Sequence, residues 1–236
     1  MSALTAETIA AALTTRRLGR PTLVFEQVGS TNDLAREYAE SGAGDGLLLL
    51  AEEQTAGRGR LDRAWWAPAG ACLLMSLLLR PALPLPRAGQ LTMRMGLGAA
   101  EGIAQVTGVE PQLKWPNDLL VRGRKLGGML TELNSVDGQL NYAVLGLGLN
   151  VNVDFARDGA PADVSGLATS LLLETGREVD RVALLAAILA RIEYWYAGPM
   201  AHESPHEAWA ARLDTLGRRV RFSLTGGALE GVAIGV

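Results

Sequence analysis

Apolar residues recur along the chain at two spacings, one typical of helices and the other typical of strands. Helical spacing predicts helices over residues 5–17, 32–40, 87–106 and 180–196. Alternating or continuous apolar runs predict strands over residues 22–27, 47–53, 71–80, 113–114, 118–121, 125–134 and 139–149. Pro81, Pro84 and Pro86 break the pattern before the third helix, and Gly217 is predicted to open a small β module.

The order of these segments indicates an α+β fold, because helices alternate with strands that short turns connect into hairpins. With 236 residues, the chain has the length of one main domain and a small appendage. We expect the main domain over residues 1–213 and a C-terminal module over residues 214–236. The module is expected to be incomplete, since its last apolar strands would leave an unpaired edge.

Composition and charge narrow the classes of function. Hydrophobic residues make up 48% of the chain and charged residues 20%, which excludes intrinsic disorder and a collagen-like fibre. The formal net charge of −3 lacks the basic excess of a dedicated nucleic-acid binder. The longest apolar run, residues 71–79, is shorter than the roughly 20 residues that cross a bilayer. We therefore expect neither nucleic acid nor a membrane as a partner.

Cysteine and lysine are both rare in this chain. Cys72 is the single cysteine, which excludes an intramolecular disulfide and a cysteine-built zinc site and favours a cytoplasmic location. The 22 basic residues comprise 20 arginines and two lysines, Lys114 and Lys125. Arginine does not replace lysine where a compact point charge is required, so the two lysines are candidates for function. Chance in a GC-rich genome is an equally good explanation.

A polar segment between two apolar strands has the composition of an anion-binding loop. Residues 54–66 read QTAGRGRLDRAWW, with three arginines close together. Gly57 and Gly59 allow close approach of the backbone to a ligand, and the arginines can grip carboxylate or phosphate oxygens in bidentate fashion. Trp65 and Trp66 add flat surfaces for stacking on a heterocycle. The alternative is a surface loop whose arginines are only solvated.

Two further segments carry candidate polar groups. Pro116 makes a rigid corner after a strand and would present Lys114 at a defined position. Asn117 and Asp118 are either turn formers or pocket residues. Residues 146–152 read GLGLNVN, where the glycines leave space or serve strand packing and Asn150 offers hydrogen bonds to a base or a phosphate. Ser30 and Thr31 stand at the start of a predicted helix, whose N–H groups can face a ligand.

Taken together, these segments resemble the biotin protein ligases, also called biotin–acetyl-CoA-carboxylase ligases. The resemblance rests on GSTN at 29–32, QTAGRGR at 54–60, KWPND at 114–118, KLGG at 125–128 with Glu132, and GLGLNVN at 146–152. It covers about residues 22–155. It implies a catalytic domain like that of class II aminoacyl-tRNA synthetases, with a small SH3-like C-terminal module. Because 21 residues precede the first predicted strand, we expect the monofunctional type, without an N-terminal DNA-binding domain.

The resemblance also implies a reaction. Biotin and MgATP would form biotinyl-5′-AMP, and a lysine of a biotin carboxyl carrier protein, a subunit of acetyl-CoA carboxylase, would then attack this mixed anhydride. The expected small molecules are therefore ATP, Mg²⁺ and biotin. A homodimer is common in the family and is a further expectation. No residue set in the sequence is assigned to a protein-bound metal.

Site residues follow from the resemblance position by position. The expected catalytic residues are Lys114, Arg58 and Arg60. The expected biotin contacts are Ser30, Thr31, Asn32, Gln54, Gly57, Arg58 and Lys114. The expected nucleotide contacts are Arg60, Arg63, Trp65, Asn117, Lys125 and Asn150. This assignment agrees with the chemistry, because two anions must meet and fixed positive groups stabilise their transition state.

The sequence departs from the family pattern at three positions, and two other functions remain open. Asp62 stands where many relatives have Gly, while Ala67 and Cys72 stand where Ser and Asn are frequent. Lipoyl or octanoyl transfer is one alternative, and its octanoyl form would use Cys72 as nucleophile, although the thiol lies in an apolar run. A non-catalytic vitamin-binding module is the other alternative. Asp118 is a candidate proton acceptor only.

Overall fold

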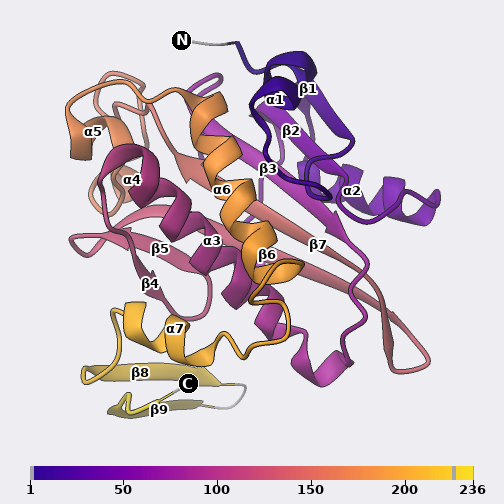
Figure 1. The fold of residues 1–236 in the computed structure, drawn as a ribbon. Coiled ribbons are helices and arrows are strands. Elements are labelled where there is room, and N and C mark those ends of the chain that lie inside the picture. Colours follow the sequence, from indigo (N-terminus) through magenta and orange to yellow (C-terminus); the bar gives the residue numbers. More distant parts are fainter. Residues whose placement is uncertain (1–2, 225–226, 236) are drawn as a thin grey trace.

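A mixed seven-stranded sheet organises the molecule (Figure 1). The computed structural model describes residues 3–224 and 227–235. The strands are β1 (Thr22–Val28), β2 (Leu48–Gln54), β3 (Cys72–Leu79), β4 (Gln112–Lys114), β5 (Asp118–Val121), β6 (Arg124–Val136) and β7 (Gln139–Asn150). Their order across the sheet is β1-β2-β3-β7-β6-β5-β4. β1 and β2 pair in parallel, and the remaining neighbours pair antiparallel.

One face of the sheet is covered by long apolar helices (Figure 1). These are α3 (Gly89–Thr107) and α6 (Arg181–Tyr196), with the short α1 (Ala6–Ala12) beside α6. Gly98 and Gly102 of α3 lie against the backbone of α6, and a Cβ at Gly102 would come within 2.6 Å of Ile188 Cα. The missing side chains let the two helices approach closely, so the main core fills this side of the sheet.

The opposite face is covered in part by α2 (Thr31–Glu40), which packs Ala35 and Ala39 against β2, β3 and β7. Three short helices follow the sheet: α4 (Ala162–Ser165), α5 (Leu171–Thr175) and α7 (His206–Arg212). Single 3₁₀ turns are present at η1 (Arg60–Asp62) and η2 (Leu85–Arg87). β8 (Arg219–Leu224) and β9 (Gly227–Val232) form a separate antiparallel pair at the C-terminal end. The described helices are too short or too polar to cross a bilayer.

The α+β prediction is confirmed, with most strands in the expected places. The first helix is shorter than predicted, since it ends at Ala12. The backbone of the segment after it binds to Glu193 of α6 and does not continue the helix. The Glu193 carboxylate accepts the backbone N–H groups of Arg16, Arg17 and Leu18, which lowers the pKa of Glu193 although burial opposes the shift. The third helix begins at Gly89 after a 3₁₀ turn.

The expected SH3-like module remains a prediction. Its described part is the β8–β9 pair, and residues 225, 226 and 236 of the predicted module lie outside the described residues. The segment before β8 is tied to the main sheet, because the Asp214 N–H donates to the carbonyl of Leu113 in β4. His202 and His206 lie around the start of α7, whose Trp209 is fully buried against Gly96 of α3.

Candidate functional site

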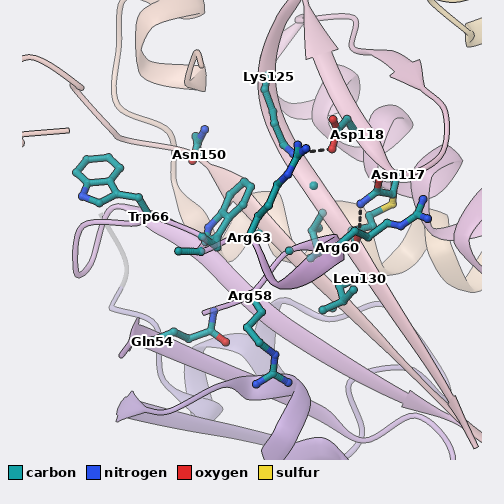
Figure 2. A pocket seen from close by; sticks show the side chains of 18 of the residues that line it. Gln54, Arg58, Arg60, Arg63, Trp66, Asn117, Asp118, Lys125, Leu130 and Asn150 are labelled. Atoms are coloured by element: carbon teal, nitrogen blue, oxygen red, sulfur yellow. Dashed lines mark hydrogen bonds and ion pairs between the residues drawn. The ribbon is translucent and has the colours of Figure 1, made fainter. Parts of the chain in front are cut away.

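A cavity of about 340 Å³ opens on the sheet face that α2 covers only in part. Its floor is the middle of β6 and β7, and its walls come from the start of α2, the loop after β2 and the segment around α4. Figure 2 shows the polar side chains that converge on this space from these separate parts of the chain. The cavity therefore brings together four segments that lie far apart in the sequence.

Glycines occupy three cavity-facing positions of the central strands, Gly128, Gly146 and Gly148. A Cβ at Gly148 would come within 2.6 Å of the Trp65 indole ring, and a Cβ at Gly146 would overlap the Asn32 side-chain oxygen. The sequence left open whether these glycines provide space or pack strands. The structure shows that they provide space for neighbouring side chains at the cavity floor.

One end of the cavity carries neutral hydrogen-bonding groups. Gln54 Oε1 accepts hydrogen bonds from the backbone N–H of Thr31 at 2.7 Å and from the Thr31 hydroxyl at 3.0 Å. The buried Ser76 hydroxyl lies 2.7 Å from Thr31 Oγ1 and 2.6 Å from Asn32 Oδ1. Ser30, Thr31 and Asn32, all predicted site residues, are themselves buried and line the cavity. These links hold the polar groups in fixed orientations.

The network continues from Asn32 to a carboxylate. Asn32 Nδ2 donates to Glu132 Oε2 at 2.6 Å and to the Leu130 carbonyl at 3.2 Å. Glu132 in turn lies near two guanidinium groups, 3.9 Å from Arg36 and 4.0 Å from Arg58. The amide orientation of Asn32 follows from these partners, because its nitrogen faces acceptors and its oxygen faces a hydroxyl.

The loop after β2 folds back on itself as a small hairpin. The Trp65 N–H donates to the Gly57 carbonyl at 2.9 Å, and the Gly59 N–H donates to the Arg63 carbonyl at 2.8 Å. Leu61 at its tip has a left-handed backbone (φ 58°) and is 82% exposed. Arg60 and Arg63 line the cavity, as predicted for anion-binding residues. Gly57 is not among the described lining residues, and its carbonyl accepts one of the hydrogen bonds that close the hairpin.

Arg58 makes an ion pair within this site. Its guanidinium binds Asp33 of α2 in bidentate fashion, with both N–O distances 2.7 Å. Hydrogen bonding by Arg58 is the largest influence on Asp33 and lowers the pKa of its carboxyl group. Figure 2 shows the Arg58 side chain extending away from Lys125 and Asp118. Arg58 lines the cavity, but its charge is directed toward α2.

Lys125 is the lysine that faces the cavity. Its ammonium group lies 2.6 Å from Asp118 Oδ1 and 5.5 Å from the centre of the Trp65 ring. The Asn117 carbonyl accepts the Met129 N–H, and Asn117 Nδ2 donates to the Met129 carbonyl at 2.6 Å. Asn117 is a turn residue and Asp118 is the first residue of β5, and both line the cavity. The Lys125 side chain is therefore partly exposed, and its ammonium group contacts both Asp118 and Trp65.

Lys114 occupies a position that differs from the expectation. It is exposed at the end of the short edge strand β4, and the described residues that line the cavity do not include it. The local reason is strand alternation, because β4 buries the neighbouring Leu113 in the core and pairs Lys114 with Asp118 in the backbone register. Lys125 lines the cavity and Lys114 is not among its described lining residues, and the catalytic role expected for Lys114 stays a prediction.

The tryptophans and Asn150 form the remaining wall. Trp65 packs over Gly148, and Trp66 lies 6.0 Å from Phe155, measured between ring centres. Both tryptophans line the cavity while also contacting a small apolar cluster. Asn150 is buried, lines the cavity and donates to the Thr169 carbonyl at 3.1 Å.

Cys72 has the environment of an unreactive thiol. It is buried within β3, and loss of hydration raises its pKa to about 12. At neutral pH the group is therefore a neutral thiol, whereas a nucleophilic cysteine acts as the thiolate. The burial expected from the apolar run is confirmed, and this argues against the octanoyl-transfer alternative.

Sequence reasoning missed Ser76, Asp33 and the wall around Val164 and Leu167. Ser76 had a signal, because it is the single polar residue within the strand CLLMSLLL. Asp33 directly follows the GSTN segment, but nothing in the sequence pairs it with Arg58. The wall comes from a loop that reaches the site through the pairing of Lys125 with Ala168. The described residues include no group of three or more His, Cys, Asp or Glu side chains suited to a metal ion.

Comparisons with known proteins show which family this chain belongs to. Residues 24–150 match the model of the biotin/lipoate A/B protein ligase family. The chain is 40% identical over 215 residues to the biotin–[acetyl-CoA-carboxylase] ligase of Mycobacterium tuberculosis, covering 86% of this chain and 75% of the relative. It is 33% identical over 226 residues to the bifunctional ligase/repressor BirA of Bacillus subtilis, covering 95% and 69%.

Solved structures of biotin protein ligases share the fold of this chain. The biotin protein ligase from Aquifex aeolicus, in complex with biotin and ATP, superposes with a TM-score of 0.75 and 29% sequence identity, covering 91% of this chain and 87% of that one. The biotin protein ligase from Leishmania major, in complex with biotin, superposes with a TM-score of 0.71 and 25% identity, covering 88% and 86%.

Proposed function

The chain belongs to the biotin/lipoate A/B protein ligase family, and within that family we propose that it is a biotin–protein ligase. It activates biotin with MgATP to biotinyl-5′-AMP and transfers the biotinyl group to a lysine of a biotin carboxyl carrier protein. Its fold is that of the biotin protein ligase catalytic domain, which resembles class II aminoacyl-tRNA synthetases. The sequence expectation of this family is thereby confirmed.

The observation that carries this proposal is the polarity of the cavity. Neutral donors and acceptors gather around Thr31 and Gln54, and the charge of the neighbouring Arg58 is paired with Asp33. Lys125 lies away from Gln54, at the other end of the cavity (Figure 2). The ureido ring of biotin has two N–H donors and one carbonyl acceptor, and its valeryl chain ends in a carboxylate. A ligand of this shape places a neutral polar ring at one end of the cavity and a negative charge at the other.

The first step joins two anions. A biotin carboxylate oxygen attacks the α-phosphorus of ATP, a P–O bond to the β-phosphate breaks, and pyrophosphate leaves with its electron pair. Repulsion between the carboxylate and the phosphates opposes this approach, so fixed cations at the developing charge are the most effective catalytic groups. Lys125, Arg60 and Arg63 line the cavity and supply this charge.

We assign the principal cation to Lys125 in place of Lys114. Asp118 and the Trp65 ring both contact the Lys125 ammonium group, which fixes it without the cost of ordering a free side chain. Lys114 projects from an exposed edge strand outside the described cavity lining. Variants of the two lysines therefore compare a cation that lines the cavity with a cation outside the described lining.

The nucleotide occupies the side of the cavity lined by the tryptophans. We propose that the adenine lies near Trp65 and Trp66, with Asn117 and Asn150 providing polar contacts. Flat aromatic surfaces favour stacking with a purine. Mg²⁺ enters as part of the MgATP substrate, bound to its phosphate oxygens, which are ligands that this ion prefers.

In the second step, the carrier lysine amine attacks the acyl carbon of biotinyl-5′-AMP. A C–N bond forms, the bond between that carbon and the phosphate oxygen breaks, and AMP leaves. The attacking amine loses a proton, and Asp118 is our candidate acceptor because its carboxylate lines the cavity beside Lys125. We further propose a carrier domain of acetyl-CoA carboxylase as acceptor, a cytoplasmic location and a homodimer.

Pyrophosphate release tests the proposed function directly. We expect release only when biotin and MgATP are both present, and no comparable release with lipoate or octanoate. Lys125→Gln should lower kcat about 100- to 1,000-fold, since a preorganised charge at a developing anion contributes on that scale. Lys114→Gln, the matched control, should change kcat far less.

Three results would overturn these assignments. A biotin-binding chain that releases no pyrophosphate would be a vitamin-binding module, and a lipoate-dependent reaction would place the chain in another branch of the family. If Lys114→Gln is the damaging variant and Lys125→Gln is not, the catalytic cation is the residue expected from sequence. Transfer of biotin to a purified carrier domain, measured by mass spectrometry, tests the second step separately.

A further inference from the structure

Glu174 is a buried carboxylate that is not among the described lining residues of the cavity. It lies in the short helix α5, and its side chain is only 2% exposed. Its Oε1 lies 2.8 Å from the Arg124 guanidinium and accepts a hydrogen bond from the Thr169 hydroxyl at 2.6 Å. Its Oε2 lies 3.6 Å from Arg122. A buried carboxylate is costly without partners, so these contacts keep Glu174 and its partners together.

Thr169 connects this carboxylate to two residues that do line the cavity, Lys125 and Asn150. Thr169 is inaccessible to solvent, and all three of its polar groups are bonded. The hydroxyl donates to Glu174, the backbone N–H donates to the Lys125 carbonyl at 2.8 Å, and the backbone carbonyl accepts from Asn150 Nδ2 at 3.1 Å. Thr169 therefore fixes the backbone of Lys125 and the side-chain amide of Asn150 together.

The arginine contacts bring the same carboxylate to the start of β6. Arg124 is the first residue of this strand, and Lys125 directly follows it. Successive side chains of a strand point in opposite directions, so Arg124 reaches Glu174 while the Lys125 ammonium group reaches Asp118. Glu174 thus holds the strand on both sides of the Lys125 side chain, through the residue before it and through the Thr169 N–H.

We propose that Glu174 is a positioning residue for the nucleotide end of the cavity. It holds Thr169 and Arg124, which in turn fix Asn150 and Lys125. This inference rests on the proposed function, which places Asn150 beside the nucleotide and Lys125 beside the reacting phosphate. Glu174 acts on ATP through these two residues, without touching it.

The neutral end of the cavity is built from other elements. Thr31 belongs to α2 and Gln54 to β2, whereas the Glu174 contacts lead to β6 and to Asn150, the last residue of β7. When only a fraction of the molecules has the nucleotide end in place, the apparent dissociation constant for ATP rises by the inverse of that fraction. Loss of the Glu174 contacts should therefore weaken the binding of ATP and leave the binding of biotin nearly unchanged.

Steady-state kinetics with biotin and MgATP test this division. Glu174→Gln keeps the shape of the side chain and removes its charge. It should raise the KM for ATP at saturating biotin roughly three- to tenfold, the scale of one contact in a buried network, with the KM for biotin changed less than twofold. Glu174→Asp keeps the charge and should restore part of the KM for ATP.

Glu101 of α3 offers a matched control on the helix face of the sheet. Its carboxylate also joins a guanidinium to a neutral donor, since it accepts from Arg191 Nε at 2.7 Å and from the Trp195 indole N–H at 3.1 Å. Glu101→Gln should leave both KM values unchanged even where it lowers stability. A general loss of structure would not separate the two carboxylates in this way.

A double-mutant cycle tests the route through Thr169. In a chain that already carries Thr169→Val, Glu174→Gln should raise the KM for ATP less than it does alone, because the hydroxyl that transmits the effect is gone. Urea unfolding of the ligand-free variants measures the same coupling without nucleotide. There the two substitutions together should raise the equilibrium constant for unfolding by less than the product of their separate effects.

Three outcomes would overturn the proposal. An unchanged KM for ATP in Glu174→Gln would show that the nucleotide end does not depend on this carboxylate. Equal rises in the KM for ATP and for biotin would show a general loss of structure. If the original chain neither binds MgATP nor releases pyrophosphate, the proposed function fails and the nucleotide role of Glu174 fails with it, whereas non-additive unfolding would still show that Glu174 and Thr169 act as one unit.

Discussion

The two faces of the central sheet are built on different principles. On one face, α3 and α6 bury an apolar core in which Leu184, Ile188 and Leu189 are inaccessible to solvent. On the other face, the same strands carry glycines and buried polar side chains around a cavity. β3 shows the contrast within one strand, since Met75 and Leu77 belong to the helix-side core while Ser76 faces the polar network.

This contrast shows where individual residues matter for chemistry and where they matter for stability. Apolar contacts are non-directional, so the helix face tolerates rearrangement as long as its volume is filled. Polar groups in the cavity wall require partners at defined angles and distances. Substitutions on the helix face should therefore change the free energy of unfolding, and substitutions on the cavity face should change substrate binding.

The largest effect on stability is expected at Leu189. Its replacement by Ala leaves a cavity in the core of the helix face and should lower the free energy of unfolding by about 2–5 kcal/mol. The KM for biotin should stay unchanged in the molecules that remain folded. Urea unfolding and initial-rate measurements at low temperature check both points. Leu189→Met, which conserves volume, should cost less than about 1.5 kcal/mol.

A smaller but more specific effect is expected at Ser76. Ser76→Ala removes a hydroxyl within hydrogen-bond distance of Thr31 and Asn32, and should lower the free energy of unfolding by about 1–3 kcal/mol. The KM for biotin should rise about tenfold, because Thr31 and Asn32 lose a fixed orientation. Isothermal titration with biotin measures the same loss of affinity.

Thr131 provides the matched control for this variant. Its hydroxyl lies 2.7 Å from that of Thr92 on the α3 side of the sheet. Thr131→Val should leave the KM for biotin unchanged even if it lowers stability. Equal changes in KM for Ser76→Ala and Thr131→Val would contradict the division of the sheet into a stabilising face and a binding face.

The smallest effect on activity is expected at Cys72, which lies on the cavity side of β3 but is buried. Cys72→Ala should change kcat less than twofold. Because burial raises the pKa of the folded thiol to about 12, its labelling at pH 8 should be roughly a thousandfold slower than in the unfolded chain, whose thiol has a pKa of about 8.5. Rapid labelling of the folded protein, or loss of acyl transfer in Cys72→Ala, would reopen the thiol mechanism.

Much of the architecture could be predicted from local patterns. The strand CLLMSLLL and the helix at residues 180–196 have apolar spacings that leave little choice of structure. Short helices such as α5 were missed, because their start depends on a single capping contact, here the Ser170 hydroxyl accepting the Leu173 N–H. The early end of α1 was missed because Glu193, far away in sequence, binds the following backbone.

The sequence by itself determined the strands, the long helices and the set of residue types that serve an anion-activating ligase, since these depend on spacing and local composition. Only the tertiary structure decided which of the two lysines lines the cavity, that Ser76 supports Thr31, and that Arg58 is held by Asp33. The first two outcomes depend on strand register, since a shift of one residue in β4 or β3 would turn Lys114 or Ser76 to the other face of the sheet. The third depends on how the loop after β2 lies against α2, and no local pattern encodes either choice.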